Sequence, residues 1–193
     1  MRICVYGAAS PTIDQQYIDQ TEKMGAEMAR RGHSLVFGGG GNGLMGAAAR
    51  GVRSGGGYIF GVIPKFFGNE SVEKICDFCD KLIEPDTMRE RKQIMEDNAD
   101  AFIVTPGGIG TYEEFFEILT LKQLCRHNKP IAVYNINGYY DGLVQVMHDA
   151  IKKNFIKENC LELFFVSDNL EALFKYIEAP VKETRTVKEL KDG

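Results

Sequence analysis

Short runs rich in β-branched residues alternate with helix-like segments along this chain, and that alternation restricts the folds it can adopt. The runs cover residues 3–6, 35–37, 58–63, 81–83, 101–104, 131–134 and 163–166. Amphipathic or alanine-rich segments lie between them, at residues 17–31 and 44–53 for example, and glycines often mark the turns. Strand, turn, helix, strand is the βαβ unit. Its repetition predicts an α/β fold: a doubly wound open sheet, mostly parallel, of about seven strands with helices on both faces.

The length and composition describe one ordinary globular domain. The chain has 193 residues, of which 44% are hydrophobic and 26% charged, values typical of a well-packed single core. We expect residues 1–179 to form a single α/β domain, whose ligand the motifs below indicate. The segment 180–193 is rich in charge and follows Pro180, so we expect a disordered C-terminal tail.

The charge balance and the apolar pattern exclude several classes of partner. A net charge of −4 and a pI near 5.5 give no basic surface for nucleic acid. No window has the 18 apolar residues of a membrane span, and no secretory signal is evident, so we expect a cytoplasmic protein without a membrane partner.

The cysteine pattern indicates reduced thiols. Five cysteines are scattered along the chain, and an odd number does not suggest a disulfide framework. Cys76 and Cys79 have the spacing of a redox pair or of half a zinc site. No second pair or nearby histidine completes a metal site, so two incidental thiols are the simpler interpretation and we expect no metal.

Two glycine-rich turns suggest contact with a ligand. The first, "GGGGNGLMG", contains Gly41-x-Gly43-x-x-Gly46, which has the spacing of a dinucleotide fingerprint. The acidic residue expected about 20 positions later is missing, so a nicotinamide-dependent oxidoreductase is a weak alternative. These glycines fit contact with a phosphate or ribose about as well as tight strand-to-helix packing.

The second turn, "TPGGIGTYEE", leads from a strand into a helix. Bare backbone amides at a helix N-terminus favour a phosphate, yet two acidic residues follow at once. A capping box with Thr111 as N-cap and Glu114 three residues later accounts for one of them without a ligand. It does not account for the glycines that precede it.

Positive charge gathers where another helix is expected to begin. In "DTMRERKQIM" the helix starts near Asp86 or Thr87, which puts Arg89, Arg91 and Lys92 near the positive end of its dipole. Solvated ion pairs with Glu90 or Glu96 are one explanation. The other is that Arg91 and Glu114 meet at the same sheet edge and share an anionic, ribose-containing ligand.

These motifs together resemble a known family. Pro106-Gly107-Gly108-x-Gly110-Thr111-x-x-Glu114 is similar to the PGGxGTxxE signature of the LOG ("lonely guy") family, whose members are cytokinin riboside 5′-monophosphate phosphoribohydrolases often mislabelled as lysine decarboxylases. The likeness extends over roughly residues 2–178 and includes "VYGAAS", "VFGGGGNGLMG", "GVIP", the element from Met88 to Lys92, and "KPIAVYNINGYYDGL".

The resemblance implies a Rossmann-like fold, a homodimer or larger homo-oligomer, and hydrolysis of the N-glycosidic bond of adenosine-type nucleoside 5′-monophosphates without a cofactor. Carried over, the catalytic residues are Arg91 and Glu114. The expected substrate-binding residues are Gly39, Gly40, Met88, Lys92, Gly107, Gly108, Gly110 and Thr111.

The chain departs from the family pattern in two places. Arg89 stands where the family usually has histidine, and "GAASPT" replaces a Gly-Ser-Ser type turn. A non-catalytic nucleotide-binding or nucleotide-sensing protein is therefore the alternative function. The sequence leaves open whether AMP or an N6-prenylated nucleotide is preferred.

Overall fold

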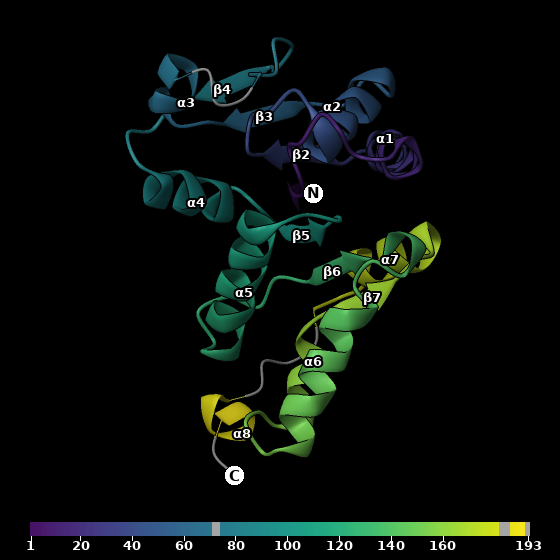
Figure 1. The fold of residues 1–193 in the computed structure, drawn as a ribbon, viewed down its shortest axis with the longest axis vertical. Coiled ribbons are helices and arrows are strands. Elements are labelled where there is room, and N and C mark those ends of the chain that lie inside the picture. The colour runs from purple at the N-terminus through teal and green to yellow at the C-terminus, as the bar shows by residue number, and fades with distance from the viewer. Residues whose placement is uncertain (71–73, 182–185, 192–193) are drawn as a thin grey trace.

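The computed structural model describes residues 1–70, 74–181 and 186–191, and its centre is one parallel sheet. The seven strands are β1 (Arg2–Tyr6), β2 (Ser34–Phe37), β3 (Ile59–Val62), β4 (Lys81–Ile83), β5 (Ala101–Val104), β6 (Ile131–Tyr134) and β7 (Phe165–Ser167). They follow the order β4-β3-β2-β1-β5-β6-β7, and every neighbouring pair is parallel. Figure 1 shows them stacked in this order along the long axis. The predicted fold class is confirmed.

Helices cover both faces of the sheet. The α-helices are α1 (Gln15–Arg30), α2 (Gly43–Ser54), α3 (Lys65–Glu70), α4 (Met88–Asp97), α5 (Ile109–Gln123), α6 (Asp141–Lys152), α7 (Leu170–Glu178) and α8 (Val187–Lys191), with two 3₁₀ helices, η1 (Ile136–Gly138) and η2 (Glu158–Leu163). Side chains alternate across β1: Ile3 and Val5 pack with α1, α2 and α7, whereas Cys4 and Tyr6 pack with α4, α5 and α6. Each face therefore has its own apolar core.

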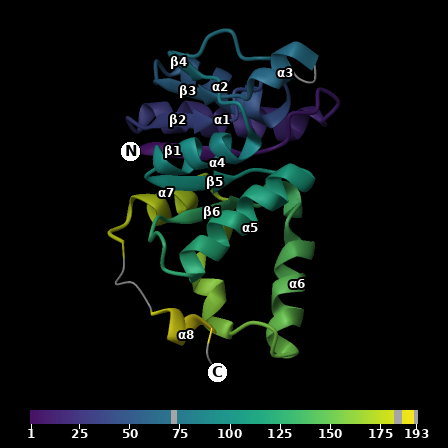
Figure 2. The same cartoon turned by 90° about the vertical axis from the view of Figure 1, so that its left-hand side faces the viewer.

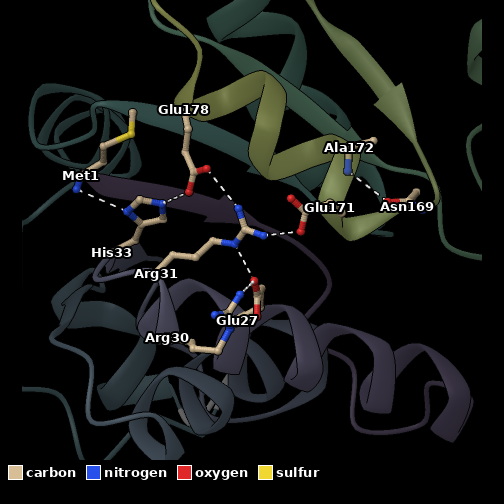
Figure 3. A network of polar contacts seen from close by, with 9 residues as sticks. All are labelled: Met1, Glu27, Arg30, Arg31, His33, Asn169, Glu171, Ala172 and Glu178. Carbon is tan, nitrogen blue, oxygen red and sulfur yellow. Dashed lines mark hydrogen bonds and ion pairs between the residues drawn. The ribbon is translucent and has the colours of Figure 1, made fainter.

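A polar network on the α1 face joins the end of α1 to α7, a helix from the C-terminal part of the chain (Figure 3). The Arg31 guanidinium donates to Glu27 and Glu171, both at 2.5 Å, and to Glu178 at 3.0 Å. His33 Nε2 lies 2.8 Å from the same Glu178 carboxylate. The end of α1 and the start of β2 are thereby tied to α7.

The C-terminal region differs in part from expectation. Residues 182–185 and 192–193 of the expected tail lie outside the described residues, but residues 186–191 contain α8. Leu190 of this helix is buried in the core that α4, α5 and α6 share. A single leucine among the charged residues thus packs against the domain. Figure 2 shows α8 near the lower end of α5 and α6.

The connections at the carboxyl edge of the sheet place the candidate residues. The chain runs outward from β1 to β4 and then returns to add β5, β6 and β7 on the other side of β1. The topological switch point therefore lies between β1 and β5, where α/β sheets of this kind bind ligands. No helix among the described residues has the length and apolar character needed to cross a membrane.

Candidate functional site

Helix α4 begins with a capping box. The backbone N–H of Glu90 donates to Thr87 Oγ1 at 3.1 Å, and the Thr87 N–H donates to Glu90 Oε2 at 3.1 Å. The helix therefore starts at Met88, as the sequence predicts, and Glu90 supplies a negative charge in its first turn. This start turns Arg91 inward toward the sheet.

Arg91 is held in a buried position above the ends of two strands. Its side chain donates from Nε to the Val62 carbonyl at 3.2 Å and from Nη2 to the Gly38 carbonyl at 3.5 Å. Only 6% of the residue is exposed. A Cβ atom at position 38 would lie 1.8 Å from Arg91 Nη2. Glycine at this position is therefore what leaves room for the guanidinium.

The guanidinium meets a carboxylate from the neighbouring helix. Arg91 Nη1 lies 3.5 Å from Glu114 Oε1, and Glu114 is only 8% exposed. Burial raises the pKa of Glu114 to about 7, and the charge of Arg91 opposes that rise. The structure thus brings the predicted arginine and acid together, and the carboxyl group titrates near neutral pH.

The position of Glu114 excludes the capping-box alternative. Helix α5 begins at Ile109 with Gly108 as its N-cap, so Thr111 and Glu114 lie inside the helix. No side-chain hydrogen bond caps this helix. The alternative interpretation of a Thr111–Glu114 capping box is therefore wrong: the helix starts with Gly108 as N-cap, three residues earlier than the local motif suggests.

The loop before α5 is anchored through its carbonyl groups. The hydroxyl of Tyr140 donates to the Thr105 carbonyl and that of Tyr139 to the Gly107 carbonyl, both at 2.7 Å. The Ala8 N–H donates to the Pro106 carbonyl at 3.1 Å. These contacts fix the loop from behind, and the backbone N–H groups of the first turn of α5 have no intrahelical acceptor.

The glycines of this loop differ in their surroundings. A Cβ atom at Gly107 would lie 2.1 Å from Thr111 Oγ1, whereas nothing lies within 4 Å of one at Gly108 or Gly110. Gly108 and Gly110 are exposed, and Thr111 is buried. Open space therefore adjoins the N-terminus of α5 at Gly108 and Gly110. The buried Thr111 hydroxyl packs against Gly107, on the protein side of this turn.

Two other predicted residues flank Arg91. Lys92 Nζ contacts Glu113 at 2.5 Å and also Glu117, so carboxylates of α5 already balance its charge. The Met88 sulfur lies 4.0 Å from Arg91 Nη1, and Met88 is exposed. The positive charge of α4 is thus offset mainly by acids of this chain.

Gly39 and Gly40 have a different environment from the one expected. Gly40 forms a β-bridge with Ile75, and the Gly39 carbonyl accepts from the Cys76 N–H at 2.8 Å. Both glycines are buried. The structure therefore packs this turn against residues 74–76.

The start of α2 is occupied by the first loop. The Ala8 carbonyl accepts from the Leu44 N–H at 2.7 Å, and a Cβ atom at Gly43 would lie 2.4 Å from the same oxygen. Gly43 has a positive φ of 57°, a conformation that glycine adopts most readily. Packing thus explains the glycines of the formal dinucleotide fingerprint.

Sequence reasoning missed three residues of this site. Gly38 makes room for Arg91, and Tyr139 and Tyr140 hold the loop before α5. The signals for the tyrosines are their place after a predicted strand and within "KPIAVYNINGYYDGL", a segment that belongs to the family resemblance. Among the described residues, no cluster of three or more His, Cys, Asp or Glu is arranged to hold a metal ion.

Comparisons with known proteins show which family this chain resembles. A family described as "Possible lysine decarboxylase" matches residues 45–177. A Mycobacterium tuberculosis protein named cytokinin riboside 5′-monophosphate phosphoribohydrolase is 41% identical over 170 residues, which are 88% of this chain and 89% of that protein. The rice (Oryza sativa) protein of the same name, LOG, is 36% identical over 182 residues, 94% of this chain and 74% of its own.

The fold also occurs at much lower sequence similarity. The molybdenum cofactor carrier protein of Chlamydomonas reinhardtii superimposes with a TM-score of 0.68 at 19% identity, covering 92% of this chain and 95% of that one. This likeness concerns the fold alone.

Proposed function

This chain belongs to the LOG ("lonely guy") family of phosphoribohydrolases, and we propose that it hydrolyses the N-glycosidic bond of an adenosine-type nucleoside 5′-monophosphate. The products are the free base and ribose 5-phosphate. The observation that carries this proposal is the buried pair of Arg91 and Glu114, which lies one helical turn from an uncapped helix N-terminus.

The 5′-phosphate binds at the start of α5. The amides of Gly108 and Gly110 and the hydroxyl of Thr111 are the donors, and the positive end of the helix dipole adds to the attraction. Support comes from the open space around Gly108 and Gly110 and from the anchored carbonyl groups behind them. We place the phosphate here rather than at α2, where the Ala8 carbonyl occupies the helix amides.

Glu114 then faces the ribose. It follows Gly110 by four residues, about 6 Å along the helix axis. Breaking the C1′–N9 bond builds positive charge on the ribose, and a nearby carboxylate stabilises that charge. The reaction therefore needs an acid beside the ribose. Glu114 is far enough from the phosphate to serve there, whereas an acid directly beside the phosphate would repel it.

The attacking water needs a base. As the water oxygen bonds to C1′ and the bond to N9 breaks, Glu114 accepts a water proton, which balances the proton taken up by the departing base. A carboxyl group with a pKa of about 7 suits this transfer at neutral pH. Arg91 orients the carboxylate, because Val62 and Gly38 fix its guanidinium on the opposite side.

We propose that the protein acts as a homo-oligomer in the cytosol. Two exposed apolar side chains on α5 support assembly: Ile109, at the edge of the phosphate site, is 90% exposed, and Phe116, two turns further along, is also exposed. Large exposed apolar patches often mark subunit contacts. None of the five cysteines, all of which lie in the described ranges, is in a disulfide, which agrees with a reducing compartment.

A direct assay tests the activity. The purified protein is incubated with AMP and, separately, with isopentenyladenosine 5′-monophosphate, and the free base and ribose 5-phosphate are followed by chromatography. Adenosine, which lacks the phosphate, is the matched control. We expect base release from at least one nucleotide and much slower release from adenosine. Nucleotide binding without any release would instead support the non-catalytic nucleotide-binding alternative.

A further inference from the structure

Two cysteines lie on either side of one turn, just before the edge strand β4. The proposed hydrolysis assigns no role to this segment. Cys76 and Cys79 flank a two-residue turn formed by Asp77 and Phe78. The first and fourth residues of such a turn have Cα atoms less than about 7 Å apart, which is near the spacing that a disulfide needs. Each thiol group is near enough to influence the ionisation of the other.

The surroundings of the pair favour a thiolate at Cys76. The Cys79 side chain is the largest influence, the backbone N–H of Phe78 adds a second, and together they lower the pKa of Cys76 to about 7 although burial opposes them. The same contact and burial raise the pKa of Cys79. The pair therefore favours the thiolate at Cys76, while Cys79 keeps its proton.

The pair is also held in place. Arg53 donates to the Phe78 carbonyl and to Asp80 Oδ1, the latter at 3.2 Å. On the inner side, a Cβ atom at Gly61 would lie only 2.9 Å from the Cys79 sulfur. The turn is therefore anchored on both sides, which keeps the two sulfurs close together.

We propose that Cys76 and Cys79 form a reversible dithiol–disulfide site that responds to peroxide. The Cys76 thiolate attacks one oxygen of hydrogen peroxide, giving a sulfenic acid and hydroxide. The Cys79 thiol then displaces the sulfenic oxygen as water and closes the disulfide. Together the two sulfurs lose two electrons, and hydrogen peroxide accepts them. A small-molecule dithiol then reduces the disulfide and restores both thiols.

The cysteine pair is linked to Arg91 through two adjacent glycines, Gly39 and Gly38. Oxidation of the pair can therefore change the activity. The Cys76 N–H donates to the Gly39 carbonyl at 2.8 Å, and the Gly41 N–H donates to the Lys74 carbonyl at 2.6 Å. Gly38, next in the chain, accepts from Arg91. Closing the disulfide shifts Cys76. Because Cys76 is hydrogen-bonded to Gly39, this shift displaces the Gly38 carbonyl and weakens the hydrogen bond that holds Arg91 in position. This consequence, unlike the disulfide itself, rests on the proposed function.

The first experiment counts thiols. The intact protein is treated with hydrogen peroxide at equimolar to tenfold ratio, denatured, blocked with maleimide and weighed by mass spectrometry, with peptide mapping to locate the bond. We expect two of the five thiols to be lost together, to map to Cys76 and Cys79, and to return with dithiothreitol. Five thiols that all stay reactive would overturn the proposal.

Variants separate the pair from other thiols. Cys125→Ser is the matched control and should still lose two thiols. Cys79→Ser should stop at a Cys76 sulfenic acid that dimedone traps, and Cys76→Ser should form no internal disulfide. If Cys76→Ser loses two thiols as the wild type does, the assignment to this turn is wrong.

The second experiment measures turnover before and after oxidation. We expect a fall of at least threefold in the wild type, full recovery with dithiothreitol, and no change in Cys76→Ser. Unchanged turnover in a preparation shown by mass to be oxidised would overturn the link to Arg91. Absence of turnover in the reduced protein would count against the proposed function instead, since the thiol count does not depend on it.

Discussion

Replacing Gly38 by alanine tests whether activity depends on the position in which Gly38 and Val62 hold the Arg91 guanidinium. The new Cβ atom would lie 1.8 Å from Arg91 Nη2 and 2.9 Å from Cζ. Non-bonded heavy atoms approach favourably only to about 3.5–4.0 Å, so the guanidinium must retreat by more than about 1 Å. It then loses the Gly38 carbonyl at 3.5 Å and its position beside Glu114, also at 3.5 Å.

The expected loss is large in activity and small in stability. A misplacement of about 1 Å at a catalytic group costs about 100-fold in rate, or about 2.7 kcal/mol. Overpacking costs about 1–3 kcal/mol of stability, and the lower end applies here because the displaced atoms end a flexible side chain.

The assay compares kcat/KM for base release with the free energy of unfolding in urea. Gly142→Ala in α6 is the matched control, because nothing lies within 4 Å of its added Cβ atom, and it should leave both quantities nearly unchanged. A Gly38→Ala protein that is as active as the wild type would refute the claim that Arg91 must occupy this position.

Three further predictions concern ionisation and the loop. Turnover should rise with pH and level off above about 7 as Glu114 ionises, and Arg91→Met should move the midpoint to higher pH because Arg91 lowers the pKa of Glu114; a pH–rate profile without an ascending limb would contradict this. Tyr140→Phe removes the hydroxyl that donates to the buried Thr105 carbonyl, so urea unfolding should show a loss of stability of about 1–3 kcal/mol. The KM for the nucleotide should also rise, and an unchanged KM would show that the position of this loop does not affect binding. Burial raises the pKa of Glu96 from 4.5 to about 7, so its contribution to stability is complete below about pH 4.5 and is lost as pH rises through 7; Glu96→Gln should flatten that part of the stability curve, and an equally steep curve would argue against it.

The strands were predictable because their signal is local. The five inner strands are short runs of largely buried β-branched or aromatic residues, whereas the edge strands β4 and β7 are more exposed. The right-handed βαβ connection restricts how such strands can be arranged. The last strand starts later than the sequence indicates, at Phe165, because Leu163 belongs to the 3₁₀ helix η2.

The helix starts show where local signals fail. The chain contains the Thr-x-x-Glu pattern at Thr87–Glu90, Thr111–Glu114 and Thr186–Glu189. The first and third pairs form the reciprocal hydrogen bonds of a capping box, and the second does not. The pattern cannot report that Gly108 has already begun the second helix. That difference turns Glu114 from a cap into a buried side chain that faces Arg91.

Contacts between distant segments were predictable only in part. The motifs predicted that Arg91 and Glu114 meet, but the suggested partners of Lys92 were Glu90 or Glu96, whereas Glu113 and Glu117 of α5 pair with it. Gly38 is one of four consecutive glycines, and only the position of Arg91 distinguishes it from its neighbours.

The most direct test of the central claim is a comparison of Glu114→Gln with the wild type. Nucleotide affinity is measured by calorimetry, and base release under single-turnover conditions. If Glu114 serves the reaction, the variant binds the nucleotide with an affinity close to that of the wild type and releases base at least about 100-fold more slowly. Equal rates in the two proteins would contradict the account, because the buried pair with Arg91 would then be only structural.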